Sequence, residues 1–292
     1  MLRSRALPLL ALVAVGGCSA AAGAPVPHDS ATPRVTATPA IRSAHELRLP
    51  LDSYALTAEE DGLVSRAFST LVADCAKRFD VETSIPAPKN ASAVEMNIRR
   101  YGLVEGSPVE KYGYGLPPKT RTAADDKGDW NPTPQEDLAL RGSADAATQP
   151  RDHHGAPLPV GGCLGETQRK LGGDPPLSPG AASLDSFKAS ENDPRVVKAM
   201  SAWAACMKTA GFSYTNPWQP NDEAWPEPAG ANEIRTAQQD VACRQRSNLV
   251  GTWLAVESAY QERLIAQHSG QFDALEKWRD RRVSVARETL GL

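Results

Sequence analysis

Two acidic residues close to cysteines are the positions best suited to acid–base chemistry. Glu166 follows Cys163 by three residues, and Asp240 precedes Cys243 by three. A pair of carboxyl groups, one protonated and one ionised, is the arrangement with which many hydrolases cleave glycosidic bonds. If disulfides bring the cysteine-bearing helices together, Glu166 and Asp240 are the candidate catalytic residues. The alternative, which we favour, is that both are capping or solvated helix residues.

A stretch rich in aromatic and amide side chains, residues 212–228, is the candidate ligand-contact surface. Aromatic faces can stack on sugar rings while neighbouring Asn, Asp and Gln side chains bond to hydroxyl groups. Tyr214, Trp218 and Trp225 are therefore the candidate contacts with a glycan or a peptide. The alternative, which we favour, is a proline-rich loop whose tryptophans pack back onto the helices.

The motifs of common enzyme classes do not occur in the sequence. There is no GxSxG nucleophile elbow, no HExxH zinc motif, no phosphate-binding loop and no EF-hand ligand series. The adjacent His153 and His154 lie in a polar, proline-rich stretch that is typical of solvated residues. We expect neither a metal nor a cofactor, and we favour a protein that is not an enzyme.

The chain begins with a short apolar segment that ends at a cysteine. Two arginines precede an apolar core over residues 6–15, which is too short to cross a bilayer as a helix. The VGGC motif ending at Cys18 resembles the lipobox of bacterial lipoproteins. That resemblance implies that residues 1–17 are a signal peptide and that Cys18 carries the lipid, on the extracytoplasmic face of the cell membrane. The alternative is an ordinary signal peptide cut in the Ala-rich residues that follow.

Charge and length limit the partners of the mature chain. Removal of residues 1–17 takes away two arginines and no acid, which leaves 30 basic and 35 acidic side chains. A net charge of −5 argues against nucleic acid as a partner, because binding to phosphates requires a basic surface. The remaining length is sufficient for a hydrophobic core in one or two domains.

The other four cysteines indicate two disulfides, because an exported chain meets an oxidising environment and none of them forms a CxxC pair. The sequences LVADCAK around Cys75 and AWAACMK around Cys206 resemble each other, and each places a cysteine late in an amphipathic helix. This internal similarity favours pairing of Cys75 with Cys163 and of Cys206 with Cys243. Four cysteines allow three connectivities, so the other two stay open.

Apolar residues recur at three- and four-residue steps in several segments, and none alternates long enough to require a sheet, so we expect an all-α fold. We expect one helical domain in the following order: signal peptide 1–17, lipidated cysteine and disordered Ala/Pro/Thr tether 18–48, N-terminal helical segment 49–112, mostly irregular Pro/Gly/Asp-rich insertion 113–160, and C-terminal helical segment 161–292.

Individual helix starts are also visible. Thr57 with Glu60 forms a capping box, and Asp193 followed by proline is a strong start. A short helix is expected after Thr133 within the insertion. The helix-rich stretch from about 233 to 290 is expected to break near Ser269 and fold into a hairpin. Tryptophans at helical spacing are expected in the core, namely Trp203, Trp253 and Trp278.

Several short blocks over most of the chain after the tether carry a further resemblance. They are Leu49-Pro50-Leu51-Asp52 with Tyr54, Arg99-Arg100-Tyr101-Gly102, Tyr112-Gly113-Tyr114, Gly161-Gly162-Cys163 with Glu166, Trp203 with Cys206-Met207, Gly211-Phe212 with Tyr214, Pro217-Trp218, and Asp240 with Cys243. Together they resemble a family of exported lipoproteins of high-GC actinobacteria whose function is uncharacterised. Asp80 departs from the pattern, because a glycine is expected there to end the helix. The resemblance implies export and disulfides and brings no catalytic residues.

These observations predict a lipid-anchored cell-envelope protein that acts as a non-enzymatic binding or adaptor module. The expected partners are the membrane, through the lipid on Cys18, and either cell-wall polymer or another envelope protein. The alternative is a cell-wall hydrolase that acts through Glu166 and Asp240.

Overall fold

The computed structural model describes residues 32–83, 97–117, 132–142, 151–152 and 154–292. The predicted signal peptide, Cys18 and His153 lie outside these ranges. The helices of the described part are the 3-10 helices η1 (Ala44–Glu46) and η2 (Pro50–Tyr54) and the α-helices α1 (Ala58–Lys77), α3 (Val109–Tyr112), α4 (Pro134–Arg141), α5 (Gly162–Lys170), α6 (Pro179–Glu191), α7 (Pro194–Thr209), α8 (Ala231–Arg246), α9 (Leu249–Gln267) and α10 (Ser269–Leu290).

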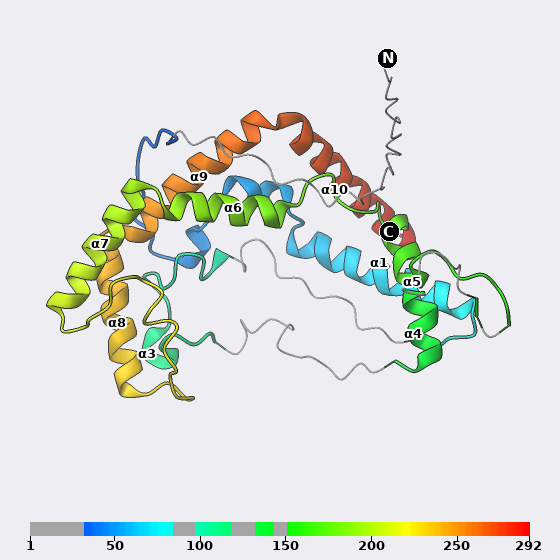
Figure 1. The fold of residues 1–292 in the computed structure, drawn as a ribbon, viewed down its shortest axis with the longest axis horizontal. Helices are drawn as coiled ribbons and strands as arrows, with labels where there is room; N and C mark the ends of the chain where they lie inside the picture. The colour runs from blue at the N-terminus through cyan, green and yellow to red at the C-terminus, as the bar shows by residue number, and fades with distance from the viewer. Residues whose placement is uncertain (1–31, 84–96, 118–131, 143–150, 153) are drawn as a thin grey trace, which may run out of the picture.

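The fold is all-α, as predicted. Apart from one isolated bridge between Arg151 and Pro157, the regular structure of the described residues is helical. Figure 1 shows the helices arranged as an arch, with α9 and α10 meeting at the top. One limb contains α3, α7 and α8, and the other contains α1, α4 and α5. In the described part of the chain, no helix combines the length and the apolar composition needed to cross a membrane.

The predicted helix starts are confirmed by their capping contacts. The Thr57 hydroxyl accepts from the backbone N–H of Glu60, whose carboxylate accepts from the N–H of Thr57 at 2.8 Å. Thr133 and Glu136 form the same reciprocal pair at the start of α4. The Asp193 carboxylate accepts a backbone N–H from the first turn of α7. These contacts satisfy backbone donors that would otherwise lack a partner at a helix start.

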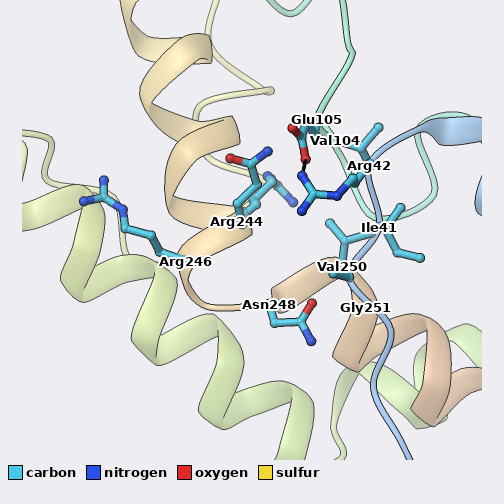
Figure 2. Close-up of a pocket in the computed structure, with 11 residues that line it drawn as sticks. Ile41, Arg42, Val104, Glu105, Arg244, Arg246, Asn248, Val250 and Gly251 are labelled. Atoms are coloured by element: carbon cyan, nitrogen blue, oxygen red, sulfur yellow. Dashed lines mark hydrogen bonds and ion pairs between the residues drawn. The ribbon is translucent and has the colours of Figure 1, made fainter.

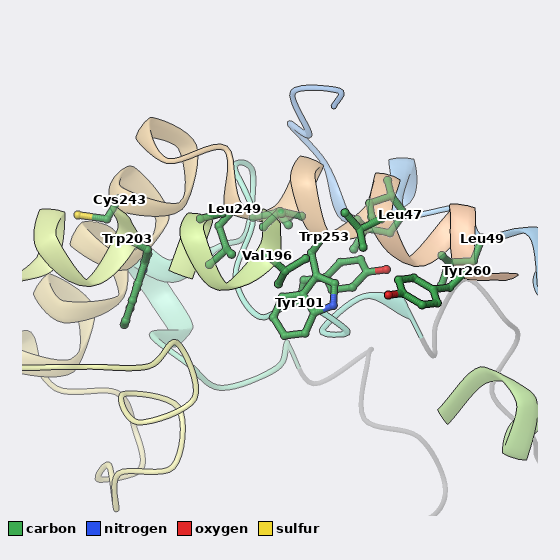
Figure 3. Close-up of a cluster of buried hydrophobic side chains, with 14 of the residues drawn as sticks. Leu47, Leu49, Tyr101, Val196, Trp203, Cys243, Leu249, Trp253 and Tyr260 are labelled. Atoms are coloured by element: carbon green, nitrogen blue, oxygen red, sulfur yellow. The ribbon is translucent and has the colours of Figure 1, made fainter. Parts of the chain in front are cut away.

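Aromatic side chains form the centre of the larger core, between α6, α7 and α9 (Figure 3). Tyr101, Trp203 and Trp253 are fully buried, and the indole N–H of Trp253 donates to the Ser190 hydroxyl at 2.9 Å. The predictions for Trp203 and Trp253 are thus confirmed. Trp278 is only partly buried and packs on a separate cluster beside α10.

A second core fills the other limb, where α1 packs against α5 and α10. Part of the expected irregular insertion contributes to it, because Leu140 of α4 and Leu158 are buried beside Phe79. The short helix predicted after Thr133 is therefore present, and it closes the apolar surface at the end of α1.

Each limb contains one disulfide, and both pairings agree with the favoured prediction. Cys75 of α1 bonds to Cys163 of α5, and Cys206 of α7 bonds to Cys243 of α8. Each bond fastens two helices that lie in the same limb, so neither disulfide links one limb to the other.

The departure at Asp80 has a structural counterpart. Asp80 adopts φ +55°, the left-handed conformation that glycine favours after a helix. Asp is among the few other residues that tolerate this conformation. The His154 imidazole lies 3.1 Å from the Asp80 carboxylate, so this side chain also contacts the end of the insertion.

Two expectations about helices are corrected. The chain does break between α9 and α10, but the two helices do not form a hairpin (Figure 1). The apolar side of α10 packs instead on α1 and η2, and α9 packs on α6 and α7. Helix α6 has no counterpart among the predicted helices, because the residues that it buries are small: Ala182, Ser186 and Ser190.

Candidate functional site

The two predicted catalytic carboxylates are not brought together. Glu166 lies on α5 and Asp240 lies on α8, and Figure 1 shows these helices in different limbs of the arch. The disulfides join each cysteine helix to a neighbour in its own limb, so they do not bring Glu166 toward Asp240. Glu166 and Asp240 therefore do not form the pair of carboxyl groups that the hydrolase hypothesis requires.

Glu166 is held by two cations beside the first disulfide. Its carboxylate accepts from the Arg78 guanidinium and from the Lys170 ammonium at 2.8 Å. Burial alone would raise the pKa of Glu166, but the hydrogen bonds from Lys170 and Arg78 outweigh it and keep the pKa below its ordinary value. A carboxylate with a lowered pKa that is paired with two cations is better suited to linking α1 and α5 than to donating a proton.

Asp240 is the centre of a buried polar network. It accepts from the Trp203 indole N–H at 2.7 Å, from Nε of Arg244 at 2.6 Å and from the Tyr114 hydroxyl at 3.2 Å. The Arg244 guanidinium also donates to the carbonyl oxygens of Tyr101 and Pro217. The Asp240 network connects α7, α8 and the three loop segments that contain Tyr101, Tyr114 and Pro217. Asp240 has no exposed surface, so it offers no face to a substrate.

The aromatic loop packs back onto the helices. The Trp218 indole N–H donates to Glu191 at 3.0 Å, and its ring lies against the larger core. Trp225 stacks on Tyr114 at a centroid distance of 5.9 Å, and the Tyr214 hydroxyl donates to Glu223 at 2.7 Å. The favoured interpretation thus matches the observed packing, and ligand contact through Tyr214, Trp218 and Trp225 stays a prediction.

Residues 32–43, called the N-terminal segment from here on, lie on the helical domain although a disordered tether was expected to reach residue 48. Arg195 donates to the Pro33 carbonyl at 2.9 Å, and the Asn248 amide donates to the Thr38 carbonyl at 3.3 Å. Val35 and Ile41 pack against the larger core. The folded part therefore begins earlier in the chain than composition indicates.

A glycine in α9 makes room for this segment. An added Cβ at Gly251 would lie 1.7 Å from the Pro39 carbonyl oxygen, far inside van der Waals contact. A cavity of about 330 Å³ adjoins the crossing point. Figure 2 shows Arg42 and Glu105 paired at its edge, while Arg246 points away from the other labelled residues. An isolated glycine inside a helical pattern often has a packing reason, and here that reason is the close approach of a second backbone.

A second cavity, called the η2 pocket from here on, has a volume of about 260 Å³ and combines aromatic with polar lining. Tyr54 and Trp278 contribute the aromatic surface, and Asp52 and Asn97 contribute the polar surface. Burial raises the pKa of the Asp52 carboxyl despite the hydrogen bonds that it accepts. The sequence indicated only that the fold opens near these residues, because the contacts that form the pocket join parts of the chain far apart in sequence.

The chain matches no known protein family, no characterised protein and no solved structure. The described residues also contain no group of three or more His, Cys, Asp or Glu side chains placed to hold a metal ion. The assignment of function therefore depends on the geometry of this chain itself.

Proposed function

We propose that the protein is held by a lipid on Cys18 at the extracytoplasmic face of the cell membrane and works there as a non-enzymatic binding or adaptor module. The observation that carries the proposal is the attachment of the N-terminal segment to α7 and α9 through Arg195 and Asn248. A chain that leaves the domain from a fixed position determines which side of an anchored domain is connected to the membrane.

The attachment also limits the distance between domain and membrane. Fourteen residue steps separate Cys18 from Thr32, and a fully extended chain spans at most about 3.6 Å per step, or roughly 50 Å. A free tether extending to residue 48 would allow about twice that distance. The proposed module therefore works close to the membrane, in the region that wall polymer and envelope proteins share.

The surroundings of the two acidic candidates support a binding module over the alternative hydrolase. Glu166 is paired with two cations, and Asp240 is buried in a network of its own. Hydrolysis by two carboxylates requires both to flank one scissile bond, about 5 to 10 Å apart. Side chains in different limbs of the arch do not meet that requirement.

Metabolic labelling with an alkyne fatty acid tests the anchor. The full chain and its Cys18→Ser variant are expressed in a lipoprotein-processing bacterium, and label and membrane fractionation are compared. We expect label and membrane association in the wild type and neither in the variant. A wild type without label, or a variant with as much label as the wild type, would overturn the anchor.

Co-sedimentation with purified cell-wall sacculi tests the binding module. The wild type is compared with the Glu166→Gln/Asp240→Asn double variant, and the supernatant is assayed for released fragments. We expect no fragments from either protein. If the wild type releases wall fragments and the double variant does not, the proposed binding module is wrong and the hydrolase is favoured.

A further inference from the structure

The η2 pocket is built by residues from four regions that are distant in sequence. Its lining comes from η2 and the residues that follow it, from the start of α6, from α10 and from Asn97. The backbone N–H of Leu51 in η2 donates to the buried Gln261 of α9 at 3.0 Å, which fixes η2 to the core. The pocket is therefore a property of the folded domain.

The aromatic walls are held in place by contacts outside the cavity. The Tyr54 ring packs on Phe272 at a centroid distance of 4.8 Å. The Trp278 indole N–H donates to the Gly172 carbonyl at 3.1 Å, and the Arg282 guanidinium lies 5.2 Å from the ring centroid. Because their positions are fixed in advance, these rings can stack on a ligand at little cost in side-chain entropy.

The polar side of the pocket offers acceptors in a fixed direction. Asp52 accepts from the Leu49 backbone N–H at 2.9 Å and from the Asn97 amide at 2.9 and 3.1 Å. Asn97 is 3% exposed, so this pair is locked in orientation. A carboxylate has about four acceptor positions, more than these bonds occupy. The three bonds leave about one acceptor position, which suits a hydroxyl or amide donor of a ligand.

The charge and the volume of the η2 pocket limit the chemical class of its ligand. The Arg279 guanidinium is engaged with the Ser53 carbonyl and with Asp280, so it is not aimed at an anion in the cavity. Two carboxylates, Asp52 and Asp61, line the pocket and disfavour a negatively charged ligand. The volume of 260 Å³ is slightly below the roughly 300–1,000 Å³ of common ligand sites, so the pocket accommodates a single ring or chain end.

We infer that the η2 pocket binds a neutral sugar ring of a glycan. A sugar ring presents an apolar face to Tyr54 and Trp278 and a hydroxyl donor to Asp52, which is the combination that the pocket offers. The inference rests on the proposed binding module and gives it a ligand class and a site. It also moves the expected contact away from the aromatic loop, whose rings are used in packing.

Glycine positions in the chain allow a direct test. An added Cβ at Gly180, which lines the pocket, meets no atom within 4 Å, and the same is true at Gly270 at the start of α10. Gly180→Phe places a ring at the pocket without a clash at Cβ, and Gly180→Ala adds only a methyl group. Gly270→Phe is the matched control, because it adds the same ring outside the pocket lining.

The full-length protein in detergent is titrated by calorimetry with a tetramer of N-acetylglucosamine and with soluble sacculus fragments made by a muramidase. Hexaproline is the peptide probe. We expect glycan binding that Gly180→Phe weakens at least tenfold, while Gly180→Ala and Gly270→Phe stay within twofold of the wild type. Circular dichroism establishes that each variant is folded.

Three results would overturn the inference. They are no binding of either glycan probe, equal binding by wild type and folded Gly180→Phe, and binding of hexaproline alone. If Gly180→Phe still co-sediments with sacculi as the wild type does, the protein binds the wall elsewhere and only the pocket assignment fails. If the wild type also fails to bind sacculi, wall polymer is excluded as the partner and an envelope protein is left.

Discussion

Replacing Gly251 by alanine should release the N-terminal segment from the helical domain. The added Cβ would lie 1.7 Å from the Pro39 carbonyl oxygen and 2.6 Å from Oδ1 of Asn248, whereas ordinary contact begins near 3.4 Å. The backbone of the segment must therefore move by about 1.7 Å, or the start of α9 must move instead. Because α9 is packed on α6 and α7, the segment is the part that gives way.

The expected loss of global stability is small. The bonds from Arg195 to Pro33 and from Asn248 to Thr38 contribute about 1 kcal/mol each. Half-burial of two aliphatic side chains adds about 1 kcal/mol each. Ordering the segment costs conformational entropy, which offsets part of this sum. We expect a loss of about 1–2 kcal/mol, and a Tm shift of roughly 2–8 °C.

Limited trypsin digestion is the decisive assay, because it reports the local opening. Cleavage after Arg34 and Arg42 requires the segment to leave the surface, and its rate follows the population of the open form. A loss of about 1.4 kcal/mol in docking free energy increases that population about tenfold. We expect at least tenfold faster cleavage at these sites, followed by mass spectrometry. The control is Gly270→Ala, whose Cβ has open space. Equal cleavage rates for the two variants would refute the reasoning.

Three further predictions concern stability. Glu257→Gln removes a fully buried charge that faces the partly buried Arg100. Urea unfolding should show a loss of about 3–5 kcal/mol, and a loss below 1 kcal/mol would contradict the assignment. The double variant Cys206→Ser/Cys243→Ser opens a loop of 37 residues and should lower the free energy of unfolding by up to about 4 kcal/mol. The denaturant midpoint under oxidising conditions measures this loss, and an unchanged midpoint would argue against the disulfide. Burial alone would raise the pKa of the Asp193 carboxyl, but the hydrogen bonds that it accepts lower this pKa in the folded protein. Ionised Asp193 therefore stabilises the fold at pH values above about 3.9, the ordinary pKa of Asp. This stabilisation is lost as the pH falls through the lower pKa of the folded state. The stability advantage of the wild type over Asp193→Asn, which retains the helix cap, should therefore shrink on acidification, and an advantage that grows at low pH would contradict the assignment.

Helix starts could be predicted from the sequence because the chemistry of a cap is local. Thr57 and Glu60, or Asp193 before a proline, satisfy backbone donors within one turn, so a few neighbouring residues contain the signal. The all-α class follows from the same short-range patterns. The favoured disulfide pairing was also visible, through the similarity between the sequences around Cys75 and Cys206.

Helix α6 was missed because the face that it buries is made of small residues. Ser186 and Ser190 are fully buried, and Ser190 accepts the indole N–H of Trp253. Hydrophobic periodicity depends on large apolar side chains, so a helix packed closely through serine and alanine gives little signal. The partner of such a helix is a large residue elsewhere in the chain, here in α9.

The sites were harder to predict because long-range contacts create them. Asp52 meets Asn97 across 45 residues, and the segment bond from Arg195 to Pro33 spans 162 residues. Composition alone predicts that the N-terminal segment is a free tether, because Ala, Thr and Pro side chains bury little apolar surface. Gly251 is a local sign that another backbone passes close to α9.

The docked segment also determines how mechanical force enters the molecule. A pull on the N-terminus is first carried by the contacts of Arg195 on α7 and of Asn248 at the start of α9. Helix α7 is covalently fastened to α8 by the Cys206–Cys243 bond, so this limb resists extension as one unit. The two contact positions, on α7 and at the start of α9, lie outside the limb that contains the Cys75–Cys163 bond. When force is applied through the N-terminal anchor, the contacts of the docked segment are therefore expected to break before either core is deformed.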